Sequence, residues 1–87
     1  MENVKTIVFI DFEYGEMRTI QVPPSEDYEQ DIRESLIDLL QERICEYAVF
    51  GFCCCKLTVH WPNNSTTDVM FRDFDELKQY YRCTTGR

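Results

Sequence analysis

The chemistry open to this sequence depends mainly on carboxylates that recur every three or four residues between positions 26 and 46. Eight acidic residues but only two basic ones, Arg33 and Arg43, occupy this segment. On a helix, five of the acids fall within a stripe about 80° wide and roughly 22 Å long. This acidic stripe comprises Asp27, Asp31, Glu34, Asp38 and Glu42.

A row of carboxylates at this spacing can imitate phosphates, because residues four apart on a helix lie about 6 Å from one another. Like charges at this spacing repel, and the helix dipole favours acids only in the first turn. We therefore interpret the acidic stripe as a binding surface for a basic partner. Asp11, Glu13 and Glu16 are expected to extend the same field. The alternative is a solvated helix face on an acidic protein.

The five cysteines are an odd number, and three of them are consecutive at Cys53, Cys54 and Cys55. Neighbours on a strand point to opposite faces, which disfavours a disulfide framework and predicts reduced thiols. Cys53 and Cys55 share a face, and His60 follows on the opposite one. A structural zinc site is therefore the alternative for this segment.

Catalytic signatures are absent from the sequence. It contains one histidine and neither a Gly-x-Ser-x-Gly nor a phosphate-binding loop pattern. Cys54 and His60 would share a strand face, but about 20 Å of strand separates them, too far for a nucleophile and its base. We expect a protein that is not an enzyme and needs no cofactor.

The 87 residues predict a single domain, 1–87, with a formal net charge of −7 and a pI of about 4.5. This charge disfavours nucleic acid and anionic membranes as direct partners. Residues 1–50 carry twelve acids and four bases, or −8, whereas residues 51–87 carry four acids and five bases, or +1. Neither a membrane-spanning apolar run nor an N-terminal signal-peptide pattern is present, which predicts a soluble intracellular protein.

Two strand pairs and two helices must position these residues. Residues 5–14 and 17–22 alternate as a hairpin, with Ile10 opposite Ile20, Val8 opposite Val22, and a three-residue turn or bulge at Gly15. The expected inward positions of the first strand are Val8, Ile10, Phe12 and Tyr14. Ile7 and Phe9 would then lie on the outer face with Met70, Lys56, Thr58 and His60, and exposed apolar residues there suggest a partner surface. The alternative is that a helix or a second copy of the chain covers part of this face.

A helix is predicted from its N-cap Ser25 to about Tyr47, with a buried stripe of Ile32, Leu36, Leu39, Leu40 and Tyr47. Residues 53–61 and 66–72 read as two further strands, with odd positions inward. A capping box at Asp73 and Glu76 opens a second helix. The order predicts an α+β fold, ββαββα, with a four-stranded antiparallel sheet and both helices on one face.

The acidic helix Ser25–Tyr47 and the alternation of hairpins and helices resemble the small phage-encoded anti-CRISPR proteins. The resemblance implies a stoichiometric inhibitor in the cytoplasm of a bacterial host, with an acidic helix that blocks a basic groove by mimicking nucleic acid. Its partner would be a basic protein such as a CRISPR nuclease or a subunit of a surveillance complex. The alternative is a protein-interaction module or complex subunit that binds through the exposed sheet face or the strand edges.

Overall fold

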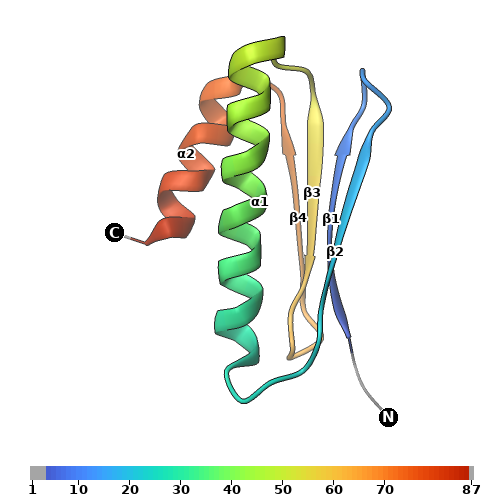
Figure 1. Ribbon diagram of the computed structural model, residues 1–87, viewed down its shortest axis with the longest axis vertical. Coiled ribbons are helices and arrows are strands. Elements are labelled where there is room, and N and C mark those ends of the chain that lie inside the picture. Colours follow the sequence, from blue (N-terminus) through green and yellow to red (C-terminus); the bar gives the residue numbers. More distant parts are fainter. Residues whose placement is uncertain (1–3, 87) are drawn as a thin grey trace.

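The computed structural model describes residues 4–86, and the predicted α+β fold is confirmed. Residues 1–3, part of the N-terminal segment that lacks a signal-peptide pattern, lie outside this range. The elements in chain order are β1 (Lys5–Asp11), β2 (Met17–Val22), α1 (Tyr28–Phe50), β3 (Cys55–His60), β4 (Thr66–Phe71) and α2 (Phe74–Thr85). All neighbouring strands are antiparallel in the order β2-β1-β3-β4. Both helices lie on one side of the sheet (Figure 1).

The predicted inward face of β1 is wrong. Ile7, Phe9 and Asp11 are buried, so the odd positions of this strand face the helices. Residues 7–10 are apolar at every position, so the pattern of apolar and polar residues does not show which face of the strand is buried. The charge of Asp11 then favours solvent for the odd positions, although this residue is in the core. Ile7 and Phe9 are therefore core residues and do not belong to the outer face.

The register of the first hairpin differs from the prediction for the same reason. Ile7 pairs with Ile20, and Ile10 pairs with Met17 instead of Ile20. The connecting loop, residues 12–16, is longer than the predicted turn. It is closed by hydrogen bonds from the Asp11 amide to the Glu16 carbonyl (2.8 Å) and from the Gly15 amide to the Asp11 carbonyl (2.9 Å). Gly15 adopts φ 70°, which favours glycine.

The face of the sheet opposite the helices, called here the open face, carries the even positions of β1, β3 and β4 and the odd positions of β2. The register aligns Met17, Ile10, Lys56 and Met70 across all four strands of this face. Phe12, Met17 and Met70 have 50%, 64% and 48% of their surface exposed. An apolar open face is therefore present, but of its predicted apolar residues only Met70 lies there. β1 contributes Val8 and Ile10 to it, and Phe12 follows the strand at the start of the hairpin loop.

The predicted apolar stripe of α1 is confirmed, because Ile32, Leu36, Leu39, Leu40 and Tyr47 are all buried. The helix begins later than predicted, with Asp27 in place of Ser25 at the N-cap position, and its last residue is Phe50. Asp27 makes no side-chain cap hydrogen bond, and Ser25 instead donates a hydrogen bond to Asp31. No helix among residues 4–86 has the length and apolar character that crossing a bilayer requires.

The second half of the chain follows the prediction closely. Cys53, Cys55, Leu57 and Val59 are buried at odd positions, and Phe71 and Leu77 complete the core from β4 and α2. The Asp73 carboxylate accepts a hydrogen bond from the Glu76 amide at 2.9 Å. Glu76 accepts from the Arg72 amide at 2.8 Å, one residue before the position that a capping box normally uses.

Leu36 tests the helix phase, since only 2% of its surface is exposed at the centre of the α1 stripe. We expect Leu36→Ala to lower the free energy of unfolding by about 2–5 kcal/mol, because it leaves a cavity between α1 and the sheet. Urea denaturation followed by circular dichroism measures this loss. Gln41→Ala, at an exposed position of the same helix, is the control and should change stability by less than about 0.5 kcal/mol. Equal losses in the two variants would contradict the assigned phase.

Candidate functional site

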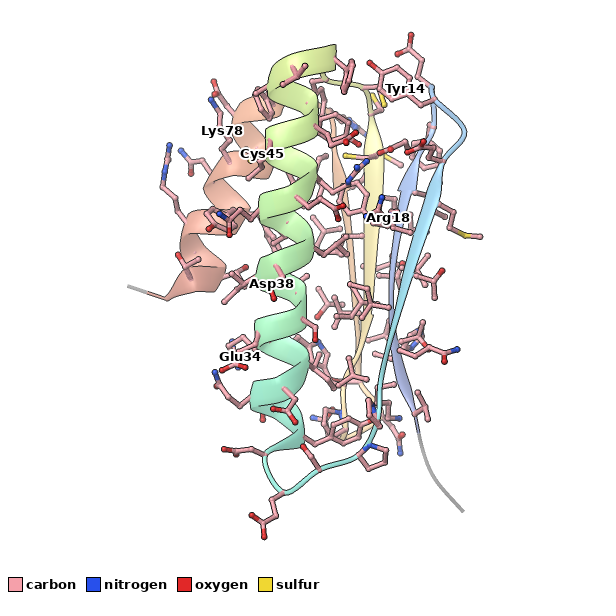
Figure 2. All side chains as sticks on the ribbon, viewed as in Figure 1. Tyr14, Arg18, Glu34, Asp38, Cys45 and Lys78 are labelled. Carbon is pink, nitrogen blue, oxygen red and sulfur yellow. The ribbon has the colours of Figure 1, made fainter. Side chains whose placement is uncertain are left out.

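The acidic stripe lies along an exposed side of α1. Figure 2 shows Glu34, Asp38 and Cys45 on this side, with none of the three directed into the sheet. Asp27, Glu34, Asp38 and Glu42 are exposed, and Asp31 is partly exposed. Because the opposite side of α1 is packed against the core, the helix presents these carboxylates on a rigid support.

Neighbouring side chains neutralise one carboxylate of the stripe and hydrogen-bond another. Arg18 on β2 forms an ion pair with Glu42, and Ser25 donates a hydrogen bond to Asp31. Glu34 has no ion pair within residues 4–86 and accepts only a 3.3 Å hydrogen bond from Gln30. Asp38 has neither an ion pair nor a side-chain hydrogen bond within the same range. The uncompensated charge at the centre of the stripe therefore belongs to Glu34 and Asp38.

Asp11 does not extend this surface, contrary to the prediction. Only 1% of its surface is exposed, and its carboxylate accepts hydrogen bonds from Arg43 Nη1 at 3.0 Å and from the Tyr47 hydroxyl. Glu13 and Glu16 are exposed on the hairpin loop, as an extended field requires. Glu16 lies 4.0 Å from Arg43 Nη1, so its charge faces the end of α1.

Arg43 is buried between α1 and β1, a position that the predicted core did not include. The signal was visible, because Arg43 falls about 20° from Leu36 on a helical projection and so lies within the apolar stripe. A charge in the core requires a partner, and Asp11 provides it across the layer. Burial raises the pKa of Asp11 above its ordinary range, and the charge of Arg43 opposes that rise. Asp11, Arg43 and Tyr47, called here the buried triad, thus join β1 to α1.

All five cysteines are free. Cys53 and Cys55 are buried in the core, whereas His60 lies on the open face, as its opposite parity predicts. Burial raises the pKa of the Cys55 thiol to about 12. Within residues 4–86, no three histidine, cysteine or acidic side chains are grouped so that they could hold a metal ion. The zinc alternative therefore gains no support from these positions.

Comparisons with protein-family models, with curated proteins and with solved structures found no match to this chain. The functional argument therefore depends on the surfaces of the molecule itself.

The buried triad yields a prediction on stability. Arg43→Met leaves the Asp11 carboxylate buried without its counter-charge, and we expect a loss of about 3–5 kcal/mol in the free energy of unfolding. The double variant Asp11→Leu/Arg43→Met should be clearly more stable than Arg43→Met, since it removes the unpaired charge as well. Urea unfolding at neutral pH measures both. Strictly additive effects of Asp11→Leu and Arg43→Met would contradict a coupled pair.

The thiols yield a second prediction. At pH 8, Cys45, Cys54 and Cys83 should react rapidly with a thiol reagent such as DTNB, because all three are exposed. Cys53 and Cys55 should react only as the protein opens, since both are buried and the high pKa of Cys55 suppresses its thiolate. Peptide mapping of the labelled sites, with a fully labelled denatured sample as control, assigns the rates. Rapid native labelling of Cys55 would show that β3 is not in the core.

Proposed function

We propose that this protein is a non-enzymatic inhibitor that binds through α1 to a basic groove of a nucleic-acid-binding protein and excludes nucleic acid from it. The observation that carries the proposal is the pair of exposed, uncompensated carboxylates Glu34 and Asp38 on a helix with a buried opposite face. A helix stabilised only for folding would gain from a lysine at either position, through pairing at i, i+4. The chain instead maintains like charges there.

The other residues of the stripe contribute to binding through the negative electrostatic potential of the protein and, for Glu42, through replacement of Arg18 by a cation of the partner. The net charge of −7 gives the protein a negative potential that steers it toward a basic surface. Glu42 becomes available when a cation of the partner replaces Arg18, and the pair is partly exposed, so this exchange costs little. Asp27 and Asp31 lie at the other end of the same side and lengthen the acidic stripe.

The resemblance to anti-CRISPR proteins supports a particular class of partner, namely a CRISPR nuclease or a subunit of a surveillance complex. Such proteins hold nucleic acid in positively charged channels that recognise the backbone. A rigid helix with carboxylates at about the spacing of phosphates is complementary to a channel of this kind. The proposal extends to this class of partner because the acidic stripe recognises the positive charge of the partner's channel and needs no particular amino-acid sequence there.

A second candidate function is a protein-interaction module that binds through the open face. The exposed side chains of Phe12, Met17 and Met70 favour it, since apolar side chains on an uncovered sheet commonly mark a partner surface. The two functions differ in their response to salt. Binding through the acidic stripe weakens steeply as ionic strength rises, whereas binding through an apolar sheet face does not.

Charge reversal tests the proposed function. Glu34→Lys/Asp38→Lys should weaken binding to a basic partner, captured from a bacterial lysate on the immobilised protein, by more than about tenfold, or 1.4 kcal/mol. The control is Asp68→Lys/Asp75→Lys, which makes the same change in net charge on the open face and on α2. Asp73 is unsuitable as a control because it caps α2. Titration of the isolated partner at physiological salt measures the affinities.

The outcomes separate the candidates. Loss of affinity in the stripe variant alone, with release of the partner by duplex nucleic acid, supports the inhibitor. Equal losses in the two variants would show a general electrostatic effect without a defined site. Loss of affinity in the control variant alone, together with binding that does not weaken as salt rises, would favour the interaction module that binds through the open face. Thermal unfolding of each variant verifies that the fold is intact.

A further inference from the structure

A preformed groove lies between the tip of the first hairpin and the last turn of α1. Its volume is about 410 Å³, and its lining residues are Tyr14, Glu16, Arg43, Glu46, Tyr47 and Phe50. The single proton of the Tyr14 hydroxyl is shared between the carbonyls of Gly51 (2.9 Å) and Phe50 (3.2 Å). These bonds fix the hairpin tip against the end of the helix, so the groove exists before any ligand enters.

The groove has an excess of negative charge. Three carboxylates surround Arg43: Asp11 at 3.0 Å, Glu46 at 3.3 Å and Glu16 at 4.0 Å. Asp11 is buried and its carboxylate contacts Arg43, so it is not accessible to a ligand. The side chains of Glu16 and Glu46 are 61% and 48% exposed. The last turn of α1 contains no basic residue, although the negative end of the helix dipole lies there. Arg43 offsets only one of these three negative charges, so the groove keeps a net negative charge that a further cation can offset.

The aromatic walls select the kind of cation. Phe50 and Tyr14 have 70% and 48% of their surface exposed, which is unusual for rings of this size. A guanidinium group stacks on aromatic rings and binds carboxylates through several donors at once, whereas an ammonium group is compact and strongly hydrated. Rings beside two exposed carboxylates thus fit an arginine side chain better than a lysine side chain or a metal ion.

The floor of the groove is formed by Arg43, whose Nη2 lies 3.3 Å from the Glu46 carboxylate as an ion pair but without hydrogen-bond geometry. Arg43 is 1% exposed, yet its Nε and Nη2 atoms donate no hydrogen bond within the described residues. Buried donors without acceptors carry a cost in free energy that a ligand can recover. An arginine side chain of a peptide segment supplies a cation for the exposed oxygens of Glu16 and Glu46.

We propose that this groove is an anchor site for an arginine-bearing segment of the partner. The guanidinium lies between Glu16 and Glu46 and stacks on Phe50 and Tyr14. The proposal rests on the proposed function in one respect, because it takes the same basic partner as the source of the arginine. It deepens that function by naming a short-range contact beside the acidic stripe.

Titration of the isotope-labelled full chain with N-acetyl-arginine methylamide tests the site directly by NMR. We expect saturable shifts of the amide signals of Tyr14, Glu16, Glu46 and Gly51. The citrulline analogue, which has the same shape without the charge, should bind at least about fivefold more weakly. Equal binding of the two compounds would overturn the proposal. Shifts spread evenly over Glu34, Asp38 and α2 would also overturn it, because they indicate a general attraction of cations.

Two variants locate the contacts. Phe50→Ala and Glu46→Gln should each weaken binding of the arginine compound by about threefold or more, through loss of the ring and of the carboxylate. Val49→Ala removes an exposed apolar side chain next to Phe50 that does not line the groove, and it should leave the affinity unchanged. Unaltered affinity in both groove variants would place the arginine elsewhere.

Measurements with the isolated partner distinguish failure of this inference from failure of the proposed function. If Phe50→Ala/Glu46→Gln weakens binding and Glu34→Lys/Asp38→Lys does not, the anchor site stands and the stripe does not. If the stripe variant alone loses affinity, the inhibitor stands and the anchor site is overturned. Loss in both variants supports both proposals.

Discussion

The ion pair between Arg43 and Asp11 is the constraint on which the rest of the structure depends. A guanidinium and a carboxylate in a core must face each other, because an unpaired buried charge costs several kcal/mol. The pair therefore ties two elements together: Arg43 lies within the apolar stripe that orients α1, and Asp11 turns the odd positions of β1 inward to meet it. The even positions of β1, Val8 and Ile10, turn to the open face as a consequence, while the apolar stripe leaves the side of α1 with Glu34 and Asp38 exposed.

The sequence was sufficient for most of the fold. α1 and β3 could be oriented because their apolar residues recur at one period only, 3.6 on the helix and 2 on the strand. β1 could not, because residues 7–10 are apolar at every position and only a long-range partner decides between the faces. The strand order β2-β1-β3-β4 was also outside the reach of local patterns. The first hairpin can pair with the second through β1 or through β2, and the packing of the helices on the sheet decides which strand is used.

The candidate site shows the same division. Periodicity placed the acidic stripe on the exposed side of α1, since that follows from the buried stripe alone. It did not reveal that Arg18 pairs with Glu42, because residues on β2 and α1 meet only in the folded chain. Asp11 illustrates the reverse error, in which a carboxylate counted as surface charge belongs to the core. Arg43 within the apolar stripe of α1 was the one local sign that a buried acid must exist elsewhere.

In the proposed complex, the stripe and the groove contribute to binding at different ranges. Glu34 and Asp38 act through a field that extends over about a Debye length, roughly 8 Å at physiological ionic strength, so they mainly accelerate association. The groove acts through contacts of a few ångströms that exclude water, so it mainly slows dissociation. The stripe belongs to α1, and the groove lies between the last turn of α1 and the hairpin tip, next to the buried pair. A helix held in this way can present a long acidic side and a short aromatic pocket in one constant orientation, which is what a partner with a basic channel and a protruding arginine requires.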